Sequence, residues 1–170
     1  MRETFELINQ MQADGVIGKY AIGGAVGATF YLEPSATVDV DIFVTLGPDS
    51  GSLLVSLAPI YNYLKHRGCT VDGEHIIVGE WPVQFLSASD ALEQEAVAES
   101  VVTEVQGEKT YVMSAEHLAA IALRTGRPKD FARLLQFVEP GVLDADRWNA
   151  ILNRHGLTSK WQQFQQRYLQ

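Results

Sequence analysis

Residues 21–44 read AIGGAVGATFYLEPSATVDVDIFV, and this stretch decides the fold. It predicts a strand that ends at residue 22, a turn at Gly23 and Gly24, a small apolar helix from residue 25, and a strand over residues 38–45. In the second strand apolar side chains alternate with Asp39 and Asp41. Residues two apart on a strand share one face, about 6.6 Å apart. The two carboxylates are therefore expected to lie side by side and to converge.

This pair of carboxylates predicts a site for a divalent cation. Two like charges on one strand face repel each other, and a cation neutralises them; oxygen ligands of this kind suit Mg²⁺, which shares its shell with substrate phosphates. Glycines at a strand-to-helix turn let the backbone approach a ligand closely, and the N–H groups from Ala25 onward face an anion. The alternative is a solvated edge strand with two surface acids after an ordinary tight turn.

The same stretch resembles the signature of a known superfamily. Ile22-Gly23-Gly24, followed after 14 residues by Asp39-Val40-Asp41-Ile42, is similar to the pattern of the DNA polymerase β-like nucleotidyltransferases. The resemblance implies a mixed sheet with helices, two Mg²⁺ ions, and transfer of a nucleoside monophosphate from an NTP to an acceptor. It also implies that Asp39 and Asp41 are the catalytic metal ligands, and that the nucleotide is bound by Gly23, Gly24 and Ala25.

A second segment resembles the helical region of the abortive-infection (AbiEii-like) nucleotidyltransferase toxins and related small bacterial proteins. Residues 114–118, SAEHL, are followed by RPKD at residues 127–130. The resemblance implies that Arg127, Lys129 and Asp130 bind the nucleotide, and that a cognate antitoxin is a partner. From the residues alone, Arg127 and Lys129 equally fit an exposed helix start, and Asp130 equally fits a first helical turn that favours acids.

The chain departs from the superfamily pattern at the third acid. Members carry a further carboxylate on a later strand, and the matching stretch here, WPVQFL at residues 81–86, has Gln84 at that position. An amide cannot act as a general base, although its oxygen can bind a metal weakly. The toxin-like pattern also continues to an acid where this chain has Arg133.

Two hypotheses about function follow from these motifs. The first is a metal-dependent nucleotidyltransferase, related to toxin–antitoxin systems, whose hydroxyl acceptor is a tRNA end, a protein side chain or a small molecule. The second is a catalytically impaired nucleotide-binding or regulatory protein on the same scaffold, with Gln84 as the lesion.

Composition narrows the partners. The 170 residues hold 13 Lys and Arg against 21 Asp and Glu, a formal net charge of −8. Such a chain gains little from counterion release, which argues against binding long nucleic acids. No stretch approaches the roughly 18 apolar residues that span a bilayer, so no membrane partner is expected. One cysteine, Cys69, excludes a disulfide framework and predicts a reducing, cytoplasmic location.

The patterns along the chain predict an α+β fold, a nucleotidyltransferase-like mixed sheet over residues 1–113 followed by a helical region over residues 114–170. Helices are expected over residues 4–14, 25–32, 53–67 with a break at Pro59, 91–98, 115–125, 128–138, 145–155 and 159–169. Strands are expected over residues 19–22, 38–45, 74–78, 81–87, 101–106 and 110–113. The last helix carries an aromatic stripe of Trp161, Phe164 and Tyr168, which predicts a core seam. The alternative is an interaction module or a homodimer face.

Overall fold

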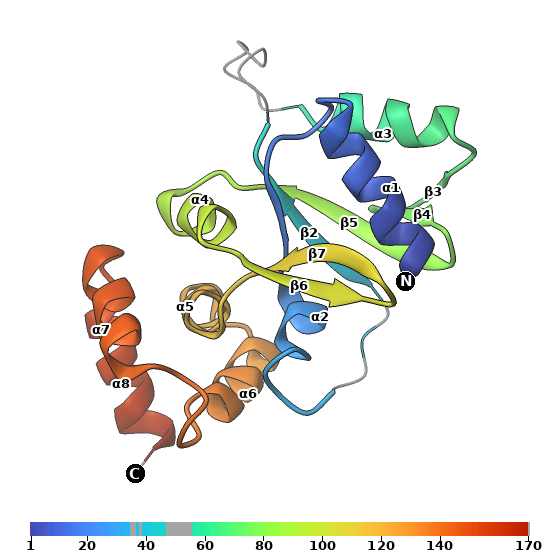
Figure 1. Ribbon diagram of the computed structural model, residues 1–170. Coiled ribbons are helices and arrows are strands. Elements are labelled where there is room, and N and C mark those ends of the chain that lie inside the picture. The colour runs from blue at the N-terminus through green and yellow to red at the C-terminus, as the bar shows by residue number, and fades with distance from the viewer. Residues whose placement is uncertain (35–36, 38, 47–55, 170) are drawn as a thin grey trace.

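The computed structural model describes residues 1–34, 37, 39–46 and 56–169, and within them the fold is α+β. A mixed sheet is formed by β1 (Tyr20–Ile22), β2 (Val40–Val44), β3 (Thr70–Asp72), β4 (His75–Val78), β5 (Trp81–Ser87), β6 (Val101–Val105) and β7 (Glu108–Val112). The helices around it are α1 (Arg2–Ala13), α2 (Gly24–Ala28), α3 (Ala58–His66), α4 (Ala91–Ala98), α5 (Ala115–Thr125), α6 (Pro128–Phe137), α7 (Ala145–Arg154) and α8 (Thr158–Tyr168) (Figure 1).

The strand order places the two central motifs next to each other. The order is β3-β4-β5-β2-β1-β7-β6, with β2 parallel to β5 and β1 parallel to β7. Strand β1 runs antiparallel to β2, and Ile22 pairs with Ile42. The turn after Ile22 therefore lies at the end of the sheet where β2 begins, beside the two predicted acids.

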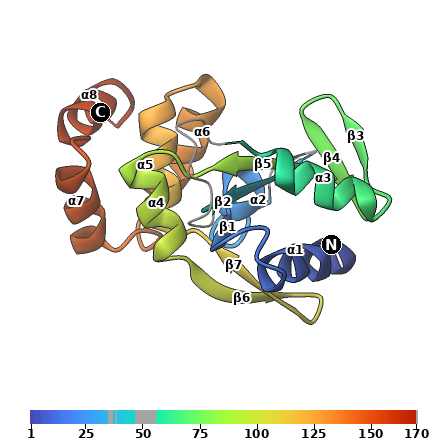
Figure 2. The same cartoon turned by 90° about the horizontal axis from the view of Figure 1, so that it is seen from above.

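The sheet is covered on both faces, and each face has its own core. Alternate residues of β2 point to opposite sides, as the sequence predicts: Val40, Ile42 and Val44 join a cluster with α1 and α3, whereas Phe43 joins a cluster with α4 to α8. Figure 2 shows α1 and α3 on one side of the sheet and the later helices on the other. Each fully buried large apolar side chain stabilises the fold by about 1.5–3 kcal/mol.

The helices after residue 113 share one core with a face of the sheet, and α7 and α8 pack on α5. Helix α5 begins at Ser114, whose side chain accepts a hydrogen bond from the N–H of His117, and ends at Gly126 with a left-handed φ of 70°. Two residues of the aromatic stripe of α8 belong to this core: Phe164 is buried, and Trp161 packs against Trp148 at a ring separation of 5.3 Å. Tyr168, the third, is exposed. The division of the chain at residue 113 stays a prediction about domains, since the helical region and the sheet share a core.

Two expected helices differ from the structure by more than two residues at one end, and one strand was not expected. The helix expected over residues 53–67 begins at Ala58, so Pro59 stands in its first turn, where a missing N–H costs nothing, and causes no break. Helix α2 ends at Ala28 rather than residue 32, because the chain turns at Thr29, whose hydroxyl donates to the carbonyl of Val26 at 2.7 Å. Strand β3 was not expected. Residues 38 and 53–55 of the expected elements lie outside the described residues.

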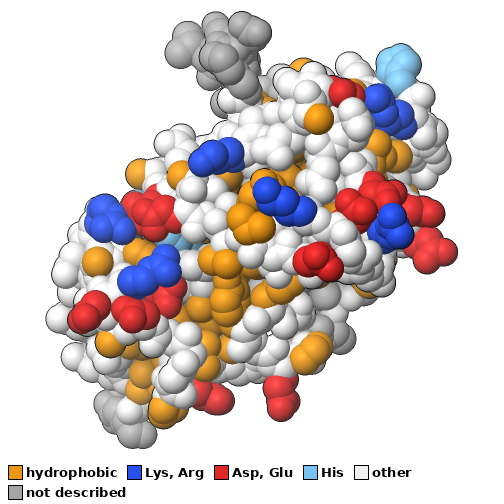
Figure 3. Space-filling model, in the orientation of Figure 1, with side chains coloured by type: hydrophobic (Ala, Val, Ile, Leu, Met, Phe, Trp, Pro, Cys, Tyr) orange, Lys and Arg blue, Asp and Glu red, His pale blue; other side chains and the backbone are white. Residues whose placement is uncertain are grey.

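The surface carries no single dominant charge on the face shown in Figure 3, where acidic and basic side chains are interspersed around apolar patches. In the described part of the chain, no helix combines the length and the apolar character needed to cross a membrane.

Candidate functional site

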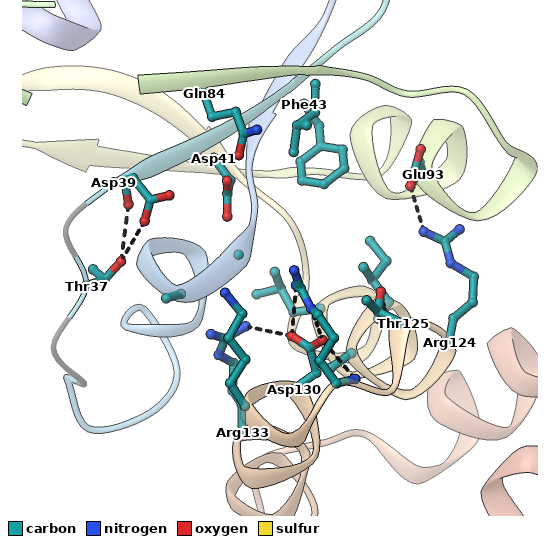
Figure 4. A pocket seen from close by; sticks show the side chains of 18 of the residues that line it. Thr37, Asp39, Asp41, Phe43, Gln84, Glu93, Arg124, Thr125, Asp130 and Arg133 are labelled. Carbon is teal, nitrogen blue, oxygen red and sulfur yellow. Dashed lines mark hydrogen bonds and ion pairs between the residues drawn. The ribbon is translucent and has the colours of Figure 1, made fainter. Parts of the chain in front are cut away.

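A cleft of about 890 Å³ lies between the sheet and helices α5 and α6. Its lining includes most of the residues singled out from the sequence, namely Gly24, Ala25, Asp39, Asp41, Gln84, Arg127, Lys129 and Asp130. Gly23 is not part of the lining, and its N–H donates a hydrogen bond to the backbone carbonyl of Asp41 at 2.9 Å. Segments about 90 residues apart in sequence thus meet in one cavity (Figure 4).

The floor of the cleft is one face of β2 and β5. The parallel register pairs Asp41 with Gln84 and Phe43 with Leu86, and neighbouring strands lie about 4.8 Å apart. Gln84 is therefore beside Asp41. Along the strands the floor changes from polar at Asp41 and Gln84 to apolar at Phe43 and Leu86.

The turn before α2 fits closely against Asp41. Gly24 has a φ of +56°, in the left-handed region that side chains rarely adopt. A Cβ placed there would overlap the Oδ2 atom of Asp41. Glycine at position 24 is thus required both by the backbone conformation and by the carboxylate packed on it.

The charge of Asp41 is poorly compensated. Burial, and then the neighbouring charge of Asp39, raise the pKa of Asp41, while Lys129, Arg133 and Arg127 act in the opposite direction. Among the residues that the structure describes, none donates a hydrogen bond to its carboxylate. The three cations face it from α6 and its start, as Figure 4 shows for Arg133. A half-buried acid without a bound donor fits a ligand that supplies positive charge.

The carboxylate of Asp39 is better supported than that of Asp41. Its Oδ2 lies 3.2 Å from Nε2 of His75 on β4, and its Oδ1 accepts from the hydroxyl of Thr37 at 3.3 Å. Sequence reasoning missed both contacts, and no spacing signal links His75 to Asp39 across 36 residues. These partners fix the orientation of Asp39 beside Asp41.

The opposite wall of the cleft holds the cations. Arg124 pairs with Asp90 and with Glu93, the latter at 2.6 Å between Nη2 and Oε1. Arg127 pairs with Asp130 at 2.6 Å between Nε and Oδ2. Lys129 and Arg133 are one helical turn apart on α6, and Arg133 lies 3.9 Å from Asp130.

Two of the cleft arginines were missed as site residues. Arg133 was noted only as a departure from the toxin-like pattern, although its position four residues after Lys129 puts both on one face of a helix. Arg124 gave no motif. The cleft lining holds four cations and four acids, so its formal charge is balanced, whereas the whole chain has a net charge of −8.

A second group of acids and histidines lies away from the cleft. Ligand atoms of Glu95, Glu99 and His117 come within 4.8 Å of one another. Both oxygens of Glu95 already have partners, because Oε1 accepts from Arg154 at 2.6 Å and Oε2 lies 2.9 Å from Nε2 of His155. The hydrogen bond from Arg154 is the main cause that lowers the pKa of Glu95 to about 2. This group is a satisfied contact between helices rather than a metal centre.

Comparisons with known proteins establish the fold. No protein-family model matches the chain, and no curated protein does either. The crystal structure of an antigenic nucleotidyltransferase-like protein from Paracoccidioides brasiliensis is similar, with a TM-score of 0.50 and 16% identity over 94% of this chain and 92% of that one. The fold is that of nucleotidyltransferase-like proteins.

Two structures of one antibiotic-resistance factor have lower scores. The solution structure of ANT(2'')-Ia gives a TM-score of 0.47 at 12% identity, covering 98% of this chain and 91% of that one. Its crystal structure in complex with adenylyl-2''-tobramycin gives 0.44 at 13% identity, covering 96% and 98%. The abortive-infection toxins named from the sequence are not among these similar structures.

Proposed function

We propose that this chain is a metal-dependent nucleotidyltransferase, which moves a nucleoside monophosphate from an NTP to a hydroxyl acceptor. The observation that carries the proposal is the carboxylate of Asp41, which accepts no hydrogen bond from the described residues, packs on Gly24 and shares one cleft with Lys129 and Arg133. A fold similar to that of a nucleotidyltransferase-like protein supports it.

The donor set of the cleft fits Mg²⁺. Asp39 and Asp41 present carboxylate oxygens on one strand face, and Gln84 adds an amide oxygen from the neighbouring strand. Hard oxygen donors of this kind are what Mg²⁺ prefers, completed by waters and phosphate oxygens. Bound there, one or two Mg²⁺ ions would supply charge stabilisation to the attacking and leaving oxygens of an in-line displacement.

The residues of the chain itself hold the triphosphate. Gly24 and Ala25 line the cleft at the start of α2, where their backbone N–H groups would meet phosphate oxygens. Lys129, together with Arg127 and Arg133, balances the negative charge of the phosphates. In the transfer, the acceptor oxygen forms a bond to the α-phosphorus while the bond to the bridging oxygen breaks, and pyrophosphate leaves. The acceptor proton passes to solvent, because Gln84 cannot take it.

A second candidate function is nucleotide binding without efficient transfer, and it is favoured by the pairing of Gln84 with Asp41. Compared with a carboxylate at this position, the neutral amide gives the metal site one negative charge fewer. It also leaves the reaction without a general base at this position. We expect Gln84→Asp to raise Mg²⁺ affinity about tenfold or to create transferase activity. An intact Gln84→Asp protein with unchanged metal affinity and activity would exclude this role for Gln84.

Calorimetric titration with the four NTPs, with and without Mg²⁺, tests the proposal. We expect the wild type to bind at least one NTP in a Mg²⁺-dependent manner, and Asp39→Asn to lose that binding. Asp146→Asn is the matched control, since it removes one exposed acid from the first turn of α7, outside the cleft. No NTP binding under any condition would overturn the proposal. The NTP that binds is then used in labelled form to search for the acceptor.

The acceptor and partners remain predictions from the sequence. An acidic chain with interspersed surface charges favours a small molecule or a protein side chain over a long nucleic acid, with a tRNA end as the remaining candidate. The sequence resemblance to abortive-infection toxins implies a cognate antitoxin partner, and the alternative is a homodimer. Residence in the cytoplasm is also a prediction.

A further inference from the structure

Asp130 is a charged residue buried beside the proposed triphosphate site, and only 2% of it is exposed. Its Oδ2 accepts hydrogen bonds from Nε of Arg127 at 2.6 Å and from the backbone N–H of the same residue at 3.2 Å. Its Oδ1 accepts from Nη2 of Arg127 at 3.2 Å and lies 3.9 Å from Nη1 of Arg133. The carboxylate of Asp130 thus faces two arginines of the cleft, Arg127 at the start of α6 and Arg133 on α6.

The exposure of these side chains is unequal. The side chain of Arg127 is 58% exposed and that of Asp130 is 3% exposed. A guanidinium has five N–H donors, and Arg127 uses two of them on Asp130. Within the described residues the other three have no hydrogen-bond partner, and Arg127 lines the cleft. A fixed carboxylate partner reduces the rotamer freedom of the arginine side chain before a ligand arrives.

We infer that Asp130 is a positioning residue that touches no ligand and holds Arg127, with Arg133 beside it, in place for the triphosphate opposite Asp41. The inference rests on the proposed function, and it changes the role that the sequence resemblance implies for Asp130 from a nucleotide ligand to a support. Asp130 supplies the buried negative charge, and the arginines make the contact.

Charge alone predicts the opposite effect of removing Asp130. Deleting a negative charge next to an anion site strengthens anion binding by Coulomb attraction. Deleting a positioning contact weakens anion binding, because Arg127 then loses its fixed geometry. Asp130→Asn keeps the size of the side chain and removes its charge, so the sign of its effect separates the two roles.

The experiment measures binding of inorganic tripolyphosphate in the presence of Mg²⁺ by calorimetry, since this probe is independent of the base. We expect Asp130→Asn to bind about five- to tenfold more weakly than the wild type. The control is Asp144→Asn, which also removes a helix-start carboxylate, one that accepts from the N–H of Arg147 at 2.9 Å outside the cleft. It should bind as the wild type does. Equal or tighter binding by Asp130→Asn would overturn the inference.

A double-variant cycle shows whether Asp130 acts through Arg127. We expect Arg127→Ala to weaken binding, and Arg127→Ala with Asp130→Asn to weaken it no further. Additive losses would overturn the inference. If thermal unfolding shows that Asp130→Asn does not fold, Arg127→Lys replaces it: this variant keeps the charge but loses the planar fork. Binding as weak as that of Arg127→Ala supports positioning, and wild-type binding overturns it. A wild type that binds no tripolyphosphate overturns the proposed function itself.

Discussion

The carboxylates of Asp41 and Glu95 differ in their hydrogen-bond partners and in the direction of their pKa shifts. Glu95, on α4, accepts hydrogen bonds from Arg154, and both His117 and His155 lie within 3.1 Å of its oxygens. Its pKa is lowered to about 2. Asp41, on β2, has cations nearby but no hydrogen-bond donor among the described residues, and its pKa is raised.

The difference separates structural charges from charges that await a ligand. Around Glu95 the folded chain supplies every partner, so this cluster fastens α4 to α5 and α7 and gains nothing from an added ion. Around Asp41 the folded chain leaves charge unmatched, a cost that a bound cation would relieve. A search by proximity of acids and histidines alone would select the cluster around Glu95, whose carboxylate already has its partners.

The largest effect is expected from Asp41→Asn. This variant should weaken Mg²⁺-dependent NTP binding by roughly 100-fold or more, because it removes a proposed metal ligand. Its thermal stability should equal or exceed that of the wild type, since the variant removes a half-buried charge that lacks a donor. Calorimetry and thermal unfolding check both parts. Retained Mg²⁺-dependent binding would place the metal elsewhere.

Gly24→Ala should affect both stability and binding, and Gly73→Ala separates the two effects. Both glycines have a positive φ, +56° at Gly24 and +62° at Gly73, but a Cβ meets Asp41 at the first and open space at the second. Left-handed strain costs about 1–2 kcal/mol at either position. Only Gly24→Ala should also weaken NTP binding, by about tenfold or more, because the new Cβ displaces Asp41, a proposed metal ligand. Equal binding by the two variants would show that Asp41 tolerates displacement.

Glu95→Gln is expected to reverse the pattern seen for Asp41→Asn. It should lower the free energy of unfolding by about 1.5–3 kcal/mol, because hydrogen bonds to a charged group are lost. NTP binding should stay at the wild-type level, since Glu95 does not line the cleft. Denaturant titration and calorimetry measure the two quantities. A variant that loses nucleotide binding without loss of stability would contradict the structural role.

The smallest effect is a difference in pH dependence between the two acids. Glu95 has a folded pKa of about 2 against an ordinary value of 4.5, so its stabilisation is present above pH 4.5 and is lost as the pH falls toward 2. For Asp41 the raised pKa gives the opposite sign: its contribution is favourable at low pH and is lost as the pH rises. Chemical denaturation at a series of pH values should show that the free energy of unfolding of the wild type falls at acid pH. The fall should be smaller in Glu95→Gln.

Local patterns in the sequence were enough for most elements of the fold. Alternation gave β2 with its buried face, and the glycine turns gave the hairpins β4–β5 and β6–β7. Helix α5 was predicted with its observed ends, Ala115 and Thr125, because Ser114 is a good N-cap residue. Strand β3 was missed because all three of its residues are exposed and show no alternation, although Asp72-Gly73 is a recognised hairpin signal.

The candidate site was harder to predict, because it depends on contacts between distant segments. The Asp39 and Asp41 pair and the glycine turn are local, and the structure places both at one end of the sheet. The approach of α6 is set by its packing on α5, which no local pattern encodes. For the same reason the roles of Arg124 and Arg133 in the cleft, and the contact of His75 with Asp39, emerge only from the folded chain.

The position of β1 between β2 and β7 also orders events during synthesis. A ribosome releases the chain from its N-terminus at about 5–20 residues per second, and β7 can join β1 only after residue 112 has emerged. The helices that cover Ala21 and Phe43 follow later still. The nascent chain therefore presents an apolar sheet face for several seconds, a surface that chaperones can bind, before the last helices shield it.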